Sequence, residues 1–220
     1  DLSRSKLNGA ILRRTDLKGS DLSEADLNIA DLTGANLVGT KLTGANLDRI
    51  KLNQAKLNGA QLSGARMTKA KLAEVDLTHA DLSGANLTGA ELNATLLEGA
   101  DLSRANLTEA ILTDANLKNA FLIGANLQKA DLQGVNLEGA DMAGVKLRHA
   151  SLKNANLKQV DLRRADLEHA DFSKANLSSA NFTGAKMSEG LFIGADLTGA
   201  NMDSAETTDT QFKGAVGFKA

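Results

Sequence analysis

One hydrophobic residue recurs at every fifth position of the chain. Leucine, methionine or phenylalanine stands at residue 2 and at each fifth residue after it, with exceptions only at Thr207 and Gly217. A small residue, usually alanine, precedes it by two positions, and the residue between them is usually Asp or Asn. Two further residues, mostly polar or glycine, complete each unit. The chain is therefore a repeat of five residues whose register is never broken by an insertion.

A period of five excludes both an amphipathic helix and a flat strand. Five residues of α-helix advance about 500°, so successive leucines would spiral around every side. In a strand, an odd period would send each next leucine to the opposite face. A tight turn once per repeat restores the register, and 18 of the 20 glycines lie two residues after the leucine position, where a type II turn needs positive φ. The pattern predicts a β-solenoid whose leucines all point inward.

Units such as Ala85-Asn86-Leu87-Thr88-Gly89 and Ala195-Asp196-Leu197-Thr198-Gly199 resemble the pentapeptide repeat family, in which A[D/N]LXX is the repeated motif. The resemblance extends over essentially the whole chain. It implies an all-β fold, a right-handed quadrilateral β-helix with four pentads per coil. On that basis we expect residues 1–220 to form a single solenoid domain of about 11 coils. Phe172, Phe192 and Phe212 lie 20 residues apart and predict one column of stacked rings.

Composition narrows the classes of partner. With 42% hydrophobic and 24% charged residues, the chain is neither a disordered polyampholyte nor a membrane span, and we expect it to be soluble. The net charge of -2 gives no bulk reason to bind nucleic acid or an anionic membrane. Cysteine is absent, so thiol usage indicates no compartment. The family resemblance implies cytoplasm, periplasm or thylakoid lumen and does not fix one of them. The first residue, Asp1, indicates a processed chain or an excised piece, and no cap is recognisable at either end.

Summed separately, the outward charges of the four sides come to -3, 0, +1 and 0, so no side carries a charged stripe. The family resemblance makes this informative. Some members confer fluoroquinolone resistance as acidic rods that resemble duplex DNA and bind DNA gyrase, and they have loop insertions and a dimerising C-terminal helix. None of these features is found here. Basic clusters such as Arg13-Arg14 and Arg163-Arg164 are interpreted as solvated charge, because Asp or Glu lies near each.

No enzyme signature is present: we find no phosphate-binding loop and no nucleophile elbow, and we assign no catalytic or cofactor-binding residue and no cofactor. Columns of Asn, such as Asn116, Asn136, Asn156 and Asn176, predict side-chain ladders with a structural role. His149 and His169 share one outward column with Glu189 and Asp209, which brings a surface metal site into consideration. A weak surface ladder is the favoured interpretation, and no metal ligand is assigned.

Exposed apolar residues are the outward feature that departs most from the repeat. Phe121 and Ile123 flank the inward Leu122, and Leu191 and Ile193 flank the inward Phe192. Isolated surface apolar residues are common, and a contact with a partner or a second copy is the alternative. The sequence favours a non-enzymatic scaffold that binds other proteins. The alternatives are a DNA-mimicking gyrase binder, a metal-binding or accessory module of a larger protein, and a homo-oligomer formed through the ends or the apolar patch.

Overall fold

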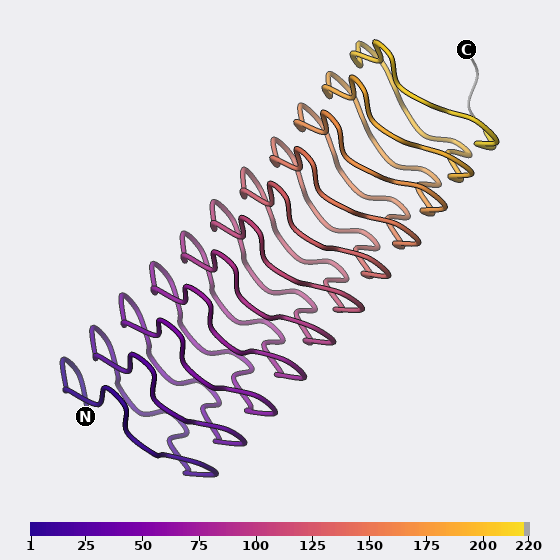
Figure 1. Cartoon of the computed structure of the whole chain (residues 1–220). Helices are drawn as coiled ribbons and strands as arrows, with labels where there is room; N and C mark the ends of the chain where they lie inside the picture. The colour runs from indigo at the N-terminus through magenta and orange to yellow at the C-terminus, as the bar shows by residue number, and fades with distance from the viewer. Residues whose placement is uncertain (218–220) are drawn as a thin grey trace.

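A computed structural model describes residues 1–217 as a four-sided rod wound from regular coils, with the N-terminus at one end (Figure 1). Parallel bridges join residues 20 positions apart, from Lys6 with Asp26 to Asp196 with Val216. Each side of a coil contributes one bridging residue, so within residues 1–217 the pairing consists of isolated bridges without helices or longer strands. The last three positions of the predicted domain lie outside the described residues.

A tight turn separates consecutive sides, as the glycine positions predict. The N–H of Ala10 donates to the carbonyl of Leu7 at 3.0 Å, and Gly9 within this turn has φ of 69°. Every fifth residue from Arg4 to Gly214 has a positive φ, whether or not it is glycine. Even the β-branched Ile29 is held at φ 55°, a conformation that costs L-residues about 1–2 kcal/mol. The coil therefore imposes the turn wherever the sequence does not favour it.

Nearly every backbone N–H in a pentad has a defined partner. In the pentad around Leu27, Leu27 donates to Asn46 at 2.8 Å, Asp26 donates back to Ser5 at 2.9 Å, and Ile29 donates forward to Asp48 at 2.9 Å. The Ala30 N–H closes the turn onto Leu27 at 3.0 Å. Proline would remove one of these bonds at almost any position, which explains its absence from the chain.

The interior is a solid column of leucine and alanine. Inward side chains from Leu22 to Leu197 are buried, and this confirms the predicted inward position of the repeated apolar residue. The predicted ring column is also confirmed, since Phe172 and Phe192 stack at 4.8 Å and Phe192 and Phe212 at 5.4 Å. Where a buried threonine stands in place of alanine, its hydroxyl has a hydrogen-bond partner, as Thr95 Oγ1 donates to the Leu72 carbonyl at 2.8 Å. A filled core leaves chemistry to the outer surface.

Candidate interaction surfaces

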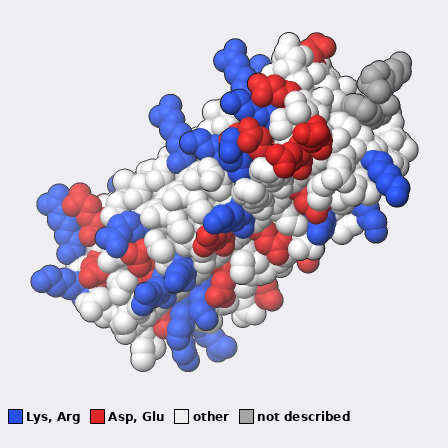
Figure 2. Space-filling view, turned by 45° about the horizontal axis from the view of Figure 1, so that its top comes forward, with Lys and Arg blue, Asp and Glu red and all other residues white. Residues whose placement is uncertain are grey.

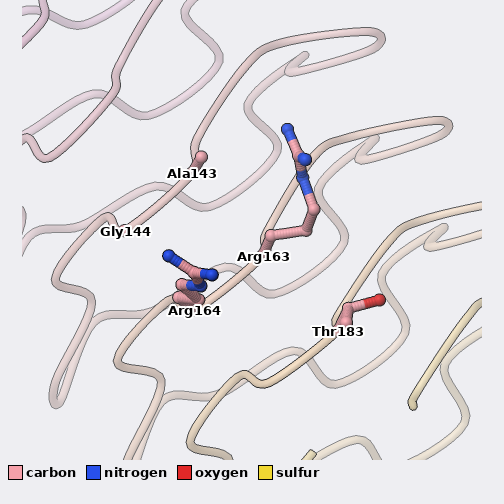
Figure 3. Close-up of a pocket in the computed structure, with 5 residues that line it drawn as sticks. All are labelled: Ala143, Gly144, Arg163, Arg164 and Thr183. Atoms are coloured by element: carbon pink, nitrogen blue, oxygen red, sulfur yellow. The ribbon is translucent and has the colours of Figure 1, made fainter. Parts of the chain in front are cut away.

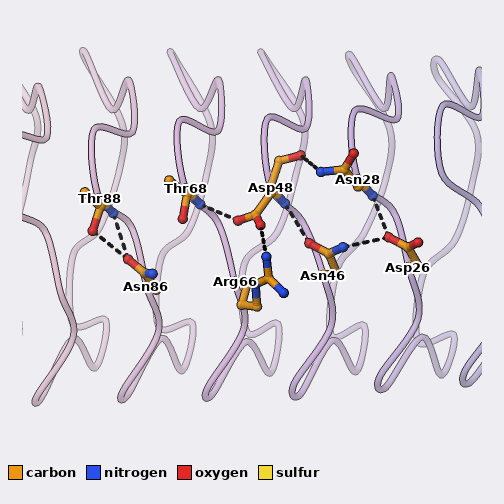
Figure 4. A network of polar contacts seen from close by, with 8 residues as sticks. All are labelled: Asp26, Asn28, Asn46, Asp48, Arg66, Thr68, Asn86 and Thr88. Carbon is orange, nitrogen blue, oxygen red and sulfur yellow. Dashed lines mark hydrogen bonds and ion pairs between the residues drawn. The ribbon is translucent and has the colours of Figure 1, made fainter.

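The Asp and Asn side chains before each leucine serve the fold. The Asp81 Oδ1 atom accepts the N–H of Ser83 at 2.9 Å, so it satisfies the one backbone donor of the pentad that the coil does not pair. The same side chains link neighbouring coils, as where Asn46 donates to Asp26 at 2.8 Å (Figure 4). The expected Asn ladder is confirmed in part, because Asn136 donates to Asn116 at 3.1 Å and Asn156 to Asn136 at 3.0 Å.

Paired carboxylates on this surface are held in the ionised form. The hydrogen bond from Arg13, at 2.8 Å, lowers the pKa of Asp31 far below its ordinary value, and Thr33 lowers it further. Burial alone would raise the pKa of Asp161, but hydrogen bonds from Arg163 lower it overall. A general acid or base needs a pKa near the working pH, and these groups are shifted in the opposite direction. Their arrangement supports ion pairing and gives no proton-transfer chemistry.

The histidine column forms the predicted ladder. The rings of His149 and His169 stack with centroids 4.7 Å apart and planes 5° apart, and a Glu189 oxygen lies 3.4 Å from His169 Nδ1. Among residues 1–217, no three metal-ligating side chains are grouped closely enough to hold an ion. We therefore describe this column as stacked surface side chains.

The structure does not bring the two predicted apolar pairs together. Phe121 and Ile123 are 48% and 43% exposed and lie on one side of the rod. Leu191 is half-buried, and Ile193 is 38% exposed. The pairs are 70 residues apart, and since one coil takes 20 residues, they lie on opposite sides. The predicted patch is thus two small separate surfaces.

The edge of the rod beside Ile123 is hollowed in two places. One depression, of about 440 Å³, is lined by Ser83, Gly84, Ser103, Arg104 and Ile123. A second, of about 580 Å³, lies farther along the same edge and is lined by Ala143, Gly144, Arg163, Arg164 and Thr183 (Figure 3). In each depression the turn that carries an arginine lies between two turns that carry glycine, Gly84 and Gly124 in the first and Gly144 and Gly184 in the second. The sequence pattern did not predict these depressions. The signal that could have indicated them is the set of small residues that recur 20 positions apart, such as Ser83 and Ser103.

Three arginines line the two depressions, and two of them are available for contact. The exception is Arg163, which is bound to Asp161 of its own pentad and which Figure 3 shows extending away from Arg164. Arg104 and Arg164 make no ion pair within the described chain and are exposed. We call the surface formed by Arg104, Phe121, Ile123 and Arg164 the glycine edge, after the glycines that open its turns.

The repeats are matched by the family model for pentapeptide repeats, in overlapping stretches from residues 1–34 to 180–216. The chain belongs to the pentapeptide repeat family. Its members are right-handed quadrilateral β-helices, and this rod has that architecture. Proteins of the family are generally structural or interaction proteins without enzymatic activity.

Two solved pentapeptide repeat structures resemble the rod over most of its length. One is HetL, a pentapeptide repeat protein involved in heterocyst differentiation regulation from the cyanobacterium Nostoc sp. strain PCC 7120. It is 35% identical, with 96% of this chain and 91% of HetL covered and a TM-score of 0.66. The other is QnrB1, a plasmid-mediated fluoroquinolone resistance protein, 20% identical over 71% of this chain and 86% of that one, with a TM-score of 0.60. At that identity the likeness to QnrB1 shows the fold alone.

No curated protein matches this sequence. Within residues 1–217 there is also no helix of the length and hydrophobicity that crossing a bilayer requires.

Proposed function

We propose that this chain is a non-enzymatic scaffold that binds a partner protein through its glycine edge. The observation that carries the proposal is the coincidence of three features along one edge. Exposed Ile123 lines one depression and exposed Phe121 precedes it by two residues, a second depression follows along the same edge, and each depression contains an arginine without an ion-pair partner in the described chain. The filled core and the structural role of the Asp and Asn side chains favour binding over catalysis.

The chemistry of the edge suggests how a partner is held. Aromatic residues and arginine are the side chains that contribute most to protein interfaces, and Phe121 is the one phenylalanine with an exposed side chain in the described chain. A partner segment that runs along the rod would cover Phe121 and Ile123 and place carboxylates near Arg104 and Arg164. The glycines of the turns allow its backbone to approach closely.

HetL supports a role that depends on contact, since it is the more similar of the two relatives and is involved in regulation. We propose that this chain acts in the same general way, through contacts with another protein. We also propose about 11 coils for the full chain, from its length and the 20 residues between bridge partners. DNA mimicry of gyrase stays the disfavoured alternative, because no side of the rod has the dense negative charge of a duplex.

The test is a capture experiment with matched variants. The wild-type protein, the Phe121→Ser/Ile123→Ser variant and the Leu191→Ser/Ile193→Ser variant are each immobilised and exposed to an extract of the source cells. Quantitative mass spectrometry should find one or more proteins retained by the wild type and by the Leu191/Ile193 control, and lost from the Phe121/Ile123 variant. Equal retention on all three proteins would overturn the assignment of the edge.

A second variant separates charge from apolar contact. Arg104→Ala/Arg164→Ala should weaken retention of the same partner about 10-fold or more, as for truncated interface arginines. Circular dichroism of each variant should match that of the wild type, because all the altered side chains in the glycine edge are exposed.

A further inference from the structure

The charges of the rod are segregated along its length rather than among its sides. Residues 41–71 contain seven Lys or Arg and one acidic residue, and we call this segment the basic belt. Residues 74–114 contain eight Asp or Glu and one Arg, and we call this segment the acidic belt. With coils spaced about 4.8 Å apart, each belt is roughly 10 Å wide, and the two adjoin. Figure 2 shows Lys and Arg side chains on the N-terminal part of the visible face and again toward its C-terminal end, with Asp and Glu beside them.

Most charges of both belts have no ion-pair partner in the described chain. In the basic belt the ion pairs are those of Lys41 with Asp21 and of Arg66 with Asp48. The remaining basic residues make none: Arg49, Lys51, Lys56, Lys69 and Lys71. In the acidic belt only Glu109 is paired, with Lys129 at 3.8 Å. The two belts are therefore not neutralised by each other, although they lie side by side.

One side of the rod displays both belts in a single column. Lys51, Lys71, Glu91 and Ile111 occupy successive bridge positions on this side. The two lysines and Ile111 are exposed, and Glu91 is half-buried. Arg49 precedes Lys51 by two residues, at the turn that borders this side. Along the rod the column therefore runs from positive charge through negative charge to an aliphatic side chain.

A partner that carries charge of only one sign fits this column poorly. A polyanion lying along the rod would meet the acidic belt within about one screening length, which is about 10 Å at 0.1 M salt, and a polycation would meet the basic belt. The column requires a partner that presents the same two belts in reverse order. A second copy of the chain, turned end for end, has that arrangement.

We propose that two copies of this chain associate side by side and antiparallel, with the basic belt of each against the acidic belt of the other. A two-fold axis between Lys71 and Glu91 makes the contact isologous, so each complementary pair occurs twice. Lys71 then faces Glu91 of the second copy, and Arg49 lies near its Glu109. The aliphatic stem of Lys51 covers the exposed Ile111 of the second copy.

The surroundings of the column are compatible with this contact. Farther out on the same side, Arg13 would lie near Lys153 of the second copy, and each is already paired, with Asp31 and Asp171 respectively. Asp131, which has no ion pair in the described chain, would face Asp31, whose charge is balanced by Arg13. Phe121 lies 10 residues, or half a coil, from Ile111 and thus on the opposite side. The glycine edge stays open in the dimer, and the two proposals can fail independently.

Sedimentation equilibrium of the full chain tests the proposal. At about 0.01 M salt the apparent mass should rise with concentration from 23.0 kDa toward twice that value. At about 1 M salt, where the screening length falls from about 30 Å to about 3 Å, it should return to that of one chain. A chain that stays monomeric at low salt, or a dimer that is insensitive to salt, overturns the proposal.

Charge reversal makes the test specific. Lys71→Glu and Glu91→Lys should each weaken association about 10-fold or more, whereas Lys158→Glu, an exposed lysine outside the belts, should not. A mixture of the Lys71→Glu and Glu91→Lys proteins should associate again, because opposite charges then meet at both copies of the pair. If the mixture stays monomeric, or if both single variants dimerise like the wild type, this contact is wrong.

Two further measurements test the antiparallel orientation of the two chains and the alternative that the column binds a polyanion. Zero-length carbodiimide crosslinking of isotopically mixed chains should join Lys71 of one chain to Glu91 of another. The second measurement is the binding of a fluorescent duplex oligonucleotide. If it binds the monomer tightly and this binding is lost in Lys71→Glu, the partner of the column is a polyanion and the proposal is overturned.

Discussion

The carboxylate of Asp48 accepts the backbone N–H of Thr68, 3.0 Å away in the next coil (Figure 4). In other pentads this N–H is bound by the Asp or Asn two residues earlier, as Asn86 binds Thr88 at 3.2 Å. Arg66 holds that position here, and a guanidinium cannot accept a hydrogen bond. Arg66 instead pairs with Asp48. One aspartate therefore binds both the cation and the backbone donor that the cation leaves without an acceptor.

Replacing Asp48 should reveal this double role. We expect Asp48→Ala to lower the free energy of unfolding by about 1–3 kcal/mol, because it leaves the Thr68 donor unsatisfied in a half-buried site. In an Arg66→Asn background, the introduced amide would supply the local acceptor, and the same substitution should cost less. Urea denaturation of the four proteins gives the coupling. Strictly additive effects would show that Asp48 does not compensate for Arg66.

Backbone strain at Ile29 should be removable. Because Ile29 is 52% exposed and held at φ 55°, Ile29→Gly should raise stability by about 0.5–1 kcal/mol. Gly84 is the matched reverse case, with φ 64° and no atom within 4 Å of an added Cβ, so Gly84→Ala should lower stability by about 1 kcal/mol through φ alone. Thermal denaturation compares the two. A loss of stability in Ile29→Gly would mean that the Ile29 side chain contributes more than its conformation costs.

Two adjacent leucines distinguish inside from outside. Leu97 is fully buried, whereas Leu96 is 47% exposed. Leu97→Asp would bury a charge without a partner and should lower stability by more than about 4 kcal/mol. Leu96→Asp restores the residue type usual at its position and should change stability by less than about 0.5 kcal/mol. Circular dichroism melting curves measure both, and similar melting temperatures for the two variants would contradict the inward assignment.

The ion pair of Asp31 should make stability depend on pH. Its pKa is lowered in the folded chain, so its contribution is fully present above the unfolded value of about 3.9 and is lost as pH falls toward the folded value. The wild type should therefore lose stability more steeply than Asp31→Asn as pH falls below about 4. Denaturation series from about pH 6 to pH 2 test this. Parallel pH profiles of the two proteins would show that the Arg13–Asp31 pair contributes nothing.

The glycine positions were sufficient to predict the turns, because a positive φ is a local property of the residue that adopts it. The same conformation at Ile29, Arg104 and His149 could not be predicted from those residues, since they adopt it only because the neighbouring coils hold the backbone there. The candidate site shows the same division. Phe121 and Ile123 were recognisable as outward apolar residues, but the depressions beside them depend on side chains one and two coils away.

The sequence by itself determined the five-residue period, the inward position of Leu97 and its equivalents, and the turns that contain glycine, since these follow from local sterics and the burial of apolar side chains. Tertiary structure decided which outward residues share a side, because that depends on how many pentads close one coil. Stacking of the coils separated Phe121 from Leu191 and placed Asp48 within reach of Thr68. It also arranged Lys71 and Glu91 as neighbours in one column, where long-range packing rather than local preference sets the contacts.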